Sequence, residues 1–347
     1  MRAVTFAGDG KVALAEVPEP ELVEPDDAIV RVTAAGICGS DLHLLHERVP
    51  GMRVGSIVGH EVVGTVHALG DRVDGFSVGD RVVVSFSIAC GGCWSCARGE
   101  QNGCEDARAL GYGEFLGDLD GGQADFVRIP HADTNLHAIP EGVSDEAAVL
   151  AGDILSTGFY IASRCEVSAS DEVAIIGAGP VGLMTLLACR ARRASRIWVI
   201  DREADRLEVA ASLGAVPVDA SAVDPVVALQ KETQERGPDA VIECVGSAAT
   251  FATSIDMVRA NGRVGVIGVH TDIEVEFPLG EAWRRGISII MGGTACVHSH
   301  WDEALDGLAS GTIDPVSIIT DRLPLDRALE GYQRFEAREA LKVILIP

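Results

Sequence analysis

The chain has 347 residues, of which 47% are hydrophobic and 23% charged, and this length allows two domains with separate cores. Its formal net charge of −24 argues against nucleic-acid or anionic-membrane partners, because neutralising phosphate groups requires clustered Lys and Arg. No apolar run approaches the roughly 18 residues of a membrane span, and the N-terminus lacks the apolar core of a signal peptide, so we expect a cytoplasmic protein.

The first part of the chain has the pattern of a small β domain. Short alternating apolar and polar runs over residues 11–32 are broken by prolines, which is typical of strands and turns. Residues 57–84 continue this pattern with many valines and regularly placed glycines. We therefore predict a strongly bent, barrel-like antiparallel domain, in which the chain turns at Gly59 before a strand.

Residue types that zinc prefers lie between these runs and at the start of the second. Cys38 offers a thiolate, His60 an imidazole and Glu61 a carboxylate. Three protein ligands with one open position are typical of catalytic zinc. Ser40 and His43 follow the cysteine closely and could move protons, although Ser40 could instead cap a helix and His43 could be a surface histidine.

Four of the nine cysteines form one short cluster. Cys90, Cys93, Cys96 and Cys104 have spacings of three, three and eight residues. Four thiolates close a tetrahedral shell, so we predict a structural zinc site rather than disulfides. An iron–sulfur cluster also uses four thiolates, and four unrelated free thiols are the simplest alternative.

An apolar helical pattern runs from Asp145 to Arg164, with Asp153 inside it. A buried carboxylate needs a partner, so Asp153 is either a ligand or a helix-capping or surface residue.

The next segment carries a dinucleotide-binding fingerprint. A buried strand is followed by G-A-G-P-V-G at 177–182, an apolar helix, and a second buried strand that ends at Asp201. Gly177 permits the tight turn, Gly179 allows the backbone to approach a pyrophosphate, and Gly182 allows the helix to pack on the strand. Asp201 lies 19 residues after Gly182, where a carboxylate can bind the adenosine ribose hydroxyls.

Helices and strands continue to alternate after Asp201, which predicts a doubly wound parallel sheet. We expect helices over 204–213, 225–236, 250–258 and 301–309, and strands over 215–218, 240–245, 262–269 and 287–291. The tail ending K-V-I-L-I-P is expected to return to the first domain.

Together these motifs resemble the zinc-dependent alcohol dehydrogenases of the medium-chain dehydrogenase/reductase superfamily. The likeness covers essentially the whole chain and rests on C-G-S-D-L-H at 38–43, G-H-E at 59–61, the four-cysteine loop, D-I-L-S-T-G at 153–158 and G-A-G-P-V-G. The resemblance implies an α/β protein with a GroES-like, mostly β catalytic domain of residues 1–156 and 297–347. A doubly wound Rossmann domain of residues 157–296 would be inserted between them.

The resemblance also assigns roles to residues. Cys38, His60 and Asp153 would hold the catalytic zinc, and Glu61 would bind it transiently. Ser40 and His43 would form the proton relay, and Asp41 would lie near the ligand histidine. The implied cofactor-binding residues are Gly177, Gly179, Pro180, Val181, Gly182, Asp201, Arg202, Arg206, Val245, Val269 and Met291. Relatives often have a basic residue that touches the pyrophosphate where this chain has Gly39.

The expected activity is reversible oxidation of a primary or secondary alcohol to an aldehyde or ketone, with zinc polarising the oxygen and NAD accepting hydride. Asp201 favours NAD over NADP, since a 2′-phosphate would face like charge. A polyol, amino-alcohol or formaldehyde dehydrogenase is the alternative. The resemblance further implies two zinc ions per chain, a small-molecule substrate, and a homo-oligomer, either a tetramer or a dimer.

Apolar residues near the first zinc motif favour a simple or aromatic alcohol over a sugar. They are expected as pocket walls at Leu44, Leu45, Val49, Met52, Val54, Leu110, Phe115 and Leu116.

Overall fold

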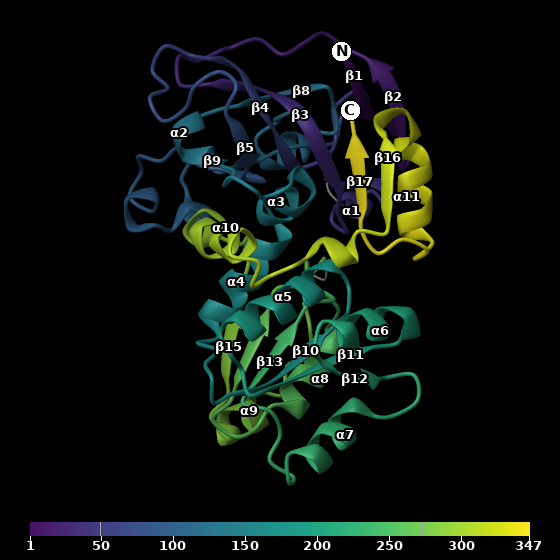
Figure 1. Cartoon of the computed structure of the whole chain (residues 1–347). Coiled ribbons are helices and arrows are strands. Elements are labelled where there is room, and N and C mark those ends of the chain that lie inside the picture. The colour runs from purple at the N-terminus through teal and green to yellow at the C-terminus, as the bar shows by residue number, and fades with distance from the viewer. Residues whose placement is uncertain (49, 272–273) are drawn as a thin grey trace. The chain divides into compact units, whose positions relative to one another are not determined.

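The computed structural model describes residues 1–48, 50–271 and 274–347, which divide into two compact units (Figure 1). Unit 1 comprises Met1–Ser156 and Cys296–Pro347, and unit 2 comprises Thr157–Ala295. Among the described helices, none combines the length and apolar composition needed to cross a bilayer.

Unit 1 is built on a mostly antiparallel sheet around β3 (Ala28–Ile37) and β4 (Glu61–Leu69), in which only the described pair β16 and β17 is parallel. The C-terminal strand β17 (Val343–Ile346) pairs antiparallel with β3, so the tail returns to this unit as expected (Figure 1). The strand order within the described residues is β16-β17-β3-β4-β5-β9, with β8 also on β3. The remaining strands are β1 (Arg2–Gly8), β2 (Lys11–Glu16), β5 (Arg81–Val84), β6 (Ser87–Ile88), β7 (Arg108–Ala109), β8 (Phe126–Ile129), β9 (Leu136–Ala138) and β16 (Asp321–Pro324).

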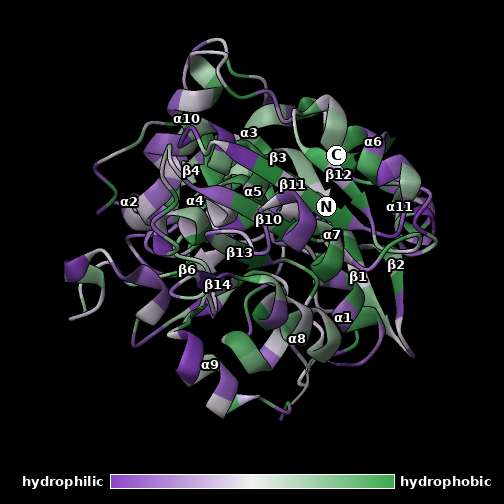
Figure 2. Ribbon diagram, turned by 90° about the horizontal axis from the view of Figure 1, so that it is seen from below, coloured by the Kyte–Doolittle hydropathy of each residue, from purple (hydrophilic) through white to green (hydrophobic). Residues whose placement is uncertain are grey.

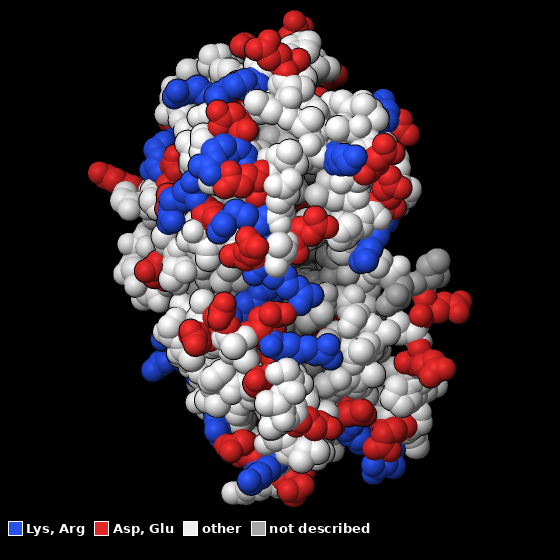
Figure 3. Space-filling view, turned by 90° about the vertical axis from the view of Figure 1, so that its right-hand side faces the viewer, with Lys and Arg blue, Asp and Glu red and all other residues white. Residues whose placement is uncertain are grey.

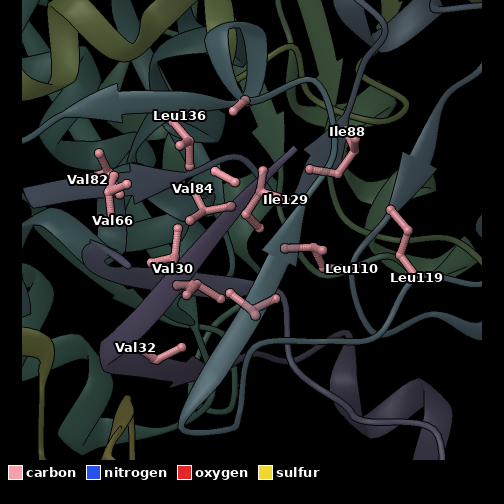
Figure 4. Packing of buried hydrophobic residues seen from close by; sticks show 14 of the residues in the cluster. Val30, Val32, Val66, Val82, Val84, Ile88, Leu110, Leu119, Ile129 and Leu136 are labelled. Atoms are coloured by element: carbon pink, nitrogen blue, oxygen red, sulfur yellow. The ribbon is translucent and has the colours of Figure 1, made fainter. Parts of the chain in front are cut away.

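The core of this sheet consists of β-branched side chains, as the valine-rich pattern predicts. Val30, Val66, Val82 and Ile129 are each at most 1% exposed, and they converge from four strands (Figure 4). Alternation along each strand sends every second side chain into this cluster, which gives the sheet a shared apolar face. Close packing of this core holds the end of β3 and the start of β4 in place. Cys38 follows the former and Glu61 begins the latter, so the candidate site lies there.

The helical pattern over 145–164 was expected to be continuous, and this prediction is wrong. The structure contains α3 (Asp145–Ala151) and α4 (Ile154–Arg164), separated at Gly152 and Asp153. The Gly152 carbonyl accepts a hydrogen bond from the Phe86 amide, and the Ala151 carbonyl accepts one from the Ser156 hydroxyl. Because these carbonyls bond outside the helical ladder, the helix breaks and Asp153 lies at the break.

Short helices complete unit 1. They are α1 (Asp41–Leu45), α2 (Ala132–Asn135), α10 (Trp301–Ala309) and α11 (Ala328–Glu336), with 3₁₀ turns at Cys96–Arg98, Gln101–Gly103, Gly113–Leu116, His298–His300, Val316–Ile318 and Leu325–Arg327.

Unit 2 contains the predicted parallel sheet, ordered β12-β11-β10-β13-β14-β15. The order of the strands reverses between β10 and β13, and the carboxyl ends of strands at such a switch point are where sheets of this kind bind ligands. The strands are β10 (Glu172–Ile176), β11 (Arg196–Asp201), β12 (Val216–Asp219), β13 (Ala240–Glu243), β14 (Arg263–Val266) and β15 (Ser288–Met291).

The helices of unit 2 carry both hydrophilic and hydrophobic residues along their length (Figure 2), as expected for elements that pack through one face. They are α4, α5 (Pro180–Ala191), α6 (Ala204–Ser212), α7 (Pro225–Glu232), α8 (Ala248–Met257) and α9 (Leu279–Arg285). The helix predicted over 225–236 ends four residues early, because Gln234 and Glu235 adopt positive φ angles of 55° and 63°.

Candidate active site and nucleotide site

A tight turn delivers His60 and Glu61 to the end of β4. Gly59 has a φ of +91°, and a Cβ there would collide with the side chain of Gln123. Only glycine adopts this conformation without strain, so the turn at Gly59 occurs where it was predicted. It leaves His60 buried just before the strand and Glu61 buried as its first residue.

Four potential metal ligands meet in unit 1. The donor atoms of Cys38, His60, Glu61 and Asp153 all lie within 4.8 Å of one another. Asp153 Oδ2 lies 3.3 Å from His60 Nε2 and 3.7 Å from Cys38 Sγ. Glu61 Oε1 is buried and has no hydrogen-bond partner in the described part of the chain. One thiol, one imidazole and two carboxylates in this arrangement fit a zinc ion.

The charges of this cluster also favour a cation. Burial, reinforced by the carboxylate of Glu61, raises the pKa of the Cys38 thiol. A thiolate here therefore requires a neighbouring positive charge, and a divalent ion supplies one.

Asp41 and Ser40 surround the imidazole of His60. Asp41 Oδ1 lies 3.1 Å from His60 Nδ1, while Asp41 Oδ2 accepts a hydrogen bond of 2.9 Å from the Cys38 amide. Asp41 Oδ1 and His60 Nδ1 are close but do not form a hydrogen bond in the described part of the chain; the negative charge of Asp41 favours a proton on Nδ1, which leaves the other nitrogen available as a ligand. Ser40 Oγ lies 3.2 Å from that other nitrogen, Nε2. Ser40 makes no side-chain capping bond to α1, so the capping alternative is not realised.

His43 is half-buried on α1. Burial first, and then the charges of Arg48 and His46, lower the pKa of His43, so its imidazole is neutral near pH 7. Its Nδ1 is buried without a hydrogen-bond partner among the described residues. A neutral imidazole in this position can accept a proton.

The partner of Glu61 is Lys342, which was not predicted from the sequence. Lys342 Nζ donates hydrogen bonds to Glu61 Oε2 and, at 3.0 Å, to the Ile37 carbonyl, and both side chains are fully buried. Burial is the largest single influence and opposes the charged form of Lys342, but the charges of Glu61, Cys38 and Asp153 and the hydrogen bond to Glu61 together outweigh it and raise the pKa of Lys342. The available signal was that one of only three lysines lies in the apolar run L-K-V-I-L-I.

Aromatic rings lie beside the candidate ligands, and this too was missed. The Tyr112 ring lies 5.4 Å from the His60 ring, and the Phe86 ring lies 6.1 Å from it, centroid to centroid.

The apolar residues expected as pocket walls differ in their exposure to solvent. Leu44 and Leu110 are buried in hydrophobic cores, whereas Val54 and Phe115 are exposed. Val49 lies outside the described residues.

The four-cysteine loop also converges. Donor atoms of Cys90, Cys93, Cys96 and Cys104 lie within 4.8 Å of one another. Backbone N–H groups point at the sulfurs, and they lower the pKa of Cys93 to about 6, with the hydrogen bond from Cys96 as the largest cause. At Cys93 this environment stabilises the thiolate, whereas burial raises the pKa of Cys96 to about 12 and also raises that of Cys104, so these two sulfurs need a bound cation to ionise.

Two residues outside the motif fix the start of this loop. Asn135 accepts a hydrogen bond of 2.9 Å from the Ala89 amide and donates one of 2.8 Å to the Ala89 carbonyl. His298 Nε2 lies 3.0 Å from Asn135 Oδ1. Burial lowers the pKa of His298 to about 4, so the imidazole is neutral and can donate to Asn135. A role for His298 could not be predicted from the sequence, because its partner Asn135 lies 163 positions away.

The glycine turn of unit 2 has the expected geometry. Gly177 has a φ of +105°, and a Cβ on Gly182 would collide with the Gly177 carbonyl oxygen. Gly179 precedes α5 without a side-chain cap, and Pro180, Val181 and Gly182 form the first turn of the helix. The free N–H groups of this helix end can bind a phosphate.

Asp201 supports this turn. It ends β11, and its Oδ2 accepts a hydrogen bond of 2.6 Å from the Ala178 amide. Its Oδ1 accepts bonds of 2.6 Å and 3.0 Å from the amides of Arg202 and Glu203. The Arg206 guanidinium lies 3.9 Å from the Cβ position of Gly179, while Arg202 is exposed.

Three apolar side chains are exposed at the same edge of the sheet. Val245 and Val269 follow the ends of β13 and β14, and Met291 ends β15. Val245 is 51% exposed, Val269 is 55% exposed and Met291 is 61% exposed. Exposed apolar groups at the carboxyl ends of parallel strands are suited to contact a ligand.

On the face shown in Figure 3, acidic and basic side chains are interspersed.

Comparison with known proteins identifies the family. The model of the alcohol dehydrogenase GroES-like domain matches residues 24–141, and the zinc-binding dehydrogenase model matches residues 180–310. The zinc-type alcohol dehydrogenase B of Aspergillus flavus is 37% identical over 355 residues, covering 99% of this chain and 81% of the relative. The chain belongs to the zinc-dependent alcohol dehydrogenases of the medium-chain superfamily.

Solved structures of this family superpose closely. The alcohol dehydrogenase from Thermus sp. ATN1 is 45% identical, with a TM-score of 0.96, over 100% of this chain and 99% of the other. A dehydrogenase from Sinorhizobium meliloti 1021 bound to NADP is 31% identical, with a TM-score of 0.88, over 100% and 99%. The protein is therefore an oxidoreductase that interconverts alcohols and carbonyl compounds, with its sheet of unit 2 as the nucleotide-binding fold.

Proposed function

We propose that Cys38, His60 and Asp153 hold the catalytic zinc, with Glu61 as an additional donor. The single observation that carries this assignment is the convergence of these four donor atoms within 4.8 Å. We assign the structural zinc to the four-cysteine loop for the same reason. Zinc fits this loop better than an iron–sulfur cluster because the family is a zinc-binding one.

When bound, zinc would act as a Lewis acid on an alcohol or carbonyl oxygen, and a nicotinamide would exchange hydride. The chain's own residues handle the proton. Ser40 is placed beside the ligand imidazole and takes the alcohol proton. His43, neutral near pH 7, is its eventual acceptor, and it returns the proton when a carbonyl is reduced.

We propose NAD rather than NADP as the preferred cofactor. The carboxylate of Asp201 stands at the end of β11, where a 2′-phosphate would meet its charge. Arg202 and Arg206 flank this position as the available cations. The Sinorhizobium structure holds NADP, so cofactor choice varies among proteins similar to this chain.

For the substrate we propose a simple or aromatic alcohol. Its support is the pair of aromatic rings, Phe86 and Tyr112, beside His60. A polyol, amino-alcohol or formaldehyde dehydrogenase is the alternative on this scaffold. A rate panel at saturating NAD should rank benzyl alcohol and short secondary alcohols above sorbitol and formaldehyde. A higher kcat/KM for sorbitol than for every simple alcohol would reject the proposed substrate class.

We also propose a homo-oligomer, a dimer or a tetramer. Its support is β15, which is the last strand of the sheet order in the described residues and so has a free edge. Trp283 on α9 is 82% exposed and adds apolar surface in unit 2. Light scattering on the purified protein decides between a monomer and these assemblies.

A further inference from the structure

A buried carboxylate in unit 2 has no part in the proposed chemistry. Glu243 ends β13, and its side chain is completely buried. Its Oε1 accepts three hydrogen bonds of 2.8 Å, from the amides of Val245 and Gly246 and from the Thr250 hydroxyl. A charged group buried in this way is costly unless several donors surround it, so the site is built around the carboxylate.

The same residue supports the neighbouring turn. Its Oε2 lies 3.3 Å from His270 Nε2, and its backbone carbonyl accepts bonds of 2.9 Å and 3.0 Å from the amides of Ile267 and Gly268. A Cβ on Gly246 would collide with the Val269 carbonyl, so the two turns are in direct contact. Glu243 thus connects the turn after β13 with the turn after β14.

Each of these turns presents one exposed apolar side chain. Val245 follows β13 and Val269 follows β14, and both are more than half exposed. The Val245 side chain also reaches the glycine fingerprint, because its Cγ2 lies 2.8 Å from the Cβ position of Gly177. Its position is therefore set from one side by the hydrogen bond from its amide to Glu243 and from the other by the phosphate-binding turn.

We propose that Glu243 is a positioning residue of the dinucleotide site. It would fix Val245 against Gly177 and keep Val245 and Val269 at the spacing that a bound nicotinamide dinucleotide requires. Glu243 is buried and need not touch the ligand. The inference rests on the proposed nucleotide site and adds to it a residue that the fingerprint does not include.

The test measures binding of NADH to the zinc-loaded protein by fluorescence titration. Glu243→Ala should raise the Kd for NADH about tenfold, since several hydrogen bonds that order the turn are lost. The KM for the coenzyme should rise in parallel, while kcat at saturating coenzyme changes less than about twofold, because the metal donors lie in unit 1. Glu243→Gln keeps one carbonyl acceptor and should restore most of the affinity.

A double-mutant cycle separates positioning from general destabilisation. If Glu243 acts through Val245, then Val245→Ala should weaken NADH binding, and the double variant should lose less than the sum of the two single losses. Additive losses would overturn the proposal. If Glu243→Ala does not fold, the cycle is run with Glu243→Asp, whose shorter side chain cannot reach the same amides, and a smaller than additive loss with Val245→Ala is again required.

Two controls keep the outcomes distinct. Asp256→Ala removes an exposed carboxylate from α8 and should leave the Kd for NADH unchanged. A folded Glu243→Ala variant with unchanged Kd would reject the role of Glu243. Failure of the parent protein to bind either NADH or NADPH would instead reject the proposed nucleotide site itself.

Discussion

Lys342 Nζ donates a hydrogen bond to Glu61 Oε2 across 281 positions of the chain, and neither side chain is exposed to solvent. The strand between them is β3, and Gly36 lies opposite both Glu61 and Ile344 in the sheet. A Cβ on Gly36 would collide with the Glu61 carboxylate, so the missing side chain makes room for this ion pair.

Lys342→Met should destabilise unit 1 strongly. The substitution leaves the Glu61 carboxylate buried without its cation, and removing one partner of such a pair costs roughly 3–5 kcal/mol. Denaturant unfolding should show this loss, and Glu61→Gln in the same background should recover part of it. Lys11→Met, at an exposed lysine of the same unit, is the matched control. Equal stability of Lys342→Met and Lys11→Met would refute the assigned pair.

The Lys342 pair shows where sequence reasoning reached its limit. The metal motifs were recognisable because C-G-S-D-L-H and G-H-E are short, contiguous patterns of donor residues. The fold class followed from periodicity, and the parallel sheet and the returning C-terminal strand are confirmed. Contacts such as Lys342 with Glu61 and His298 with Asn135 depend on strand order and register, which a local pattern does not contain.

The break between α3 and α4 at Asp153 illustrates a second limit of prediction from sequence. Apolar spacing over 145–164 predicts one helix, and it cannot reveal that the Phe86 amide bonds to the Gly152 carbonyl. Likewise, the motif identified Gly177 and Gly182, but the support of their turn by Asp201, and of the neighbouring Val245 turn by Glu243, emerged only from the structure. Tertiary hydrogen bonds determine both features.

Cofactor preference should follow the charge of Asp201. Asp201→Gly should raise kcat/KM with NADP relative to NAD on the order of tenfold, because the repulsion of the 2′-phosphate is removed. Steady-state rates with both cofactors measure the change, and Asp205→Ala, at an exposed acid on α6, should have no such effect. A parent protein that already turns over faster with NADP would contradict the assignment.

The four-cysteine loop should affect stability more than chemistry. Cys96→Ser should remove one zinc per chain and lower the unfolding temperature, since a structural ion contributes directly to folding. Metal analysis and calorimetry measure both effects. Cys296→Ser, at a buried cysteine outside both donor groups, should retain two zinc ions. The prediction fails if Cys96→Ser retains two as well.

His298 should make stability depend on pH. Its pKa is lowered from 6.5 to about 4 by burial, so the unfolded chain takes up a proton that the folded state refuses. The contribution of neutral His298 to the free energy of unfolding is fully present above pH 6.5. It is lost as the pH falls toward 4, and the free energy of unfolding then decreases by at most about 3 kcal/mol. His298→Gln should flatten the unfolding free energy over this interval. The exposed His67→Gln should leave the slope intact; an unchanged slope in His298→Gln would count against the assignment.

The central claim is that one zinc ion, held by Cys38, His60 and Asp153, carries the alcohol chemistry. The most direct measurement is zinc content together with turnover of Cys38→Ser, with the circular dichroism spectrum as the check on folding. We expect one zinc per chain in place of two and a fall in kcat of at least about a thousandfold, because the Lewis acid is lost while the fold persists. Full turnover in Cys38→Ser, or in protein stripped of its metal, would contradict the account.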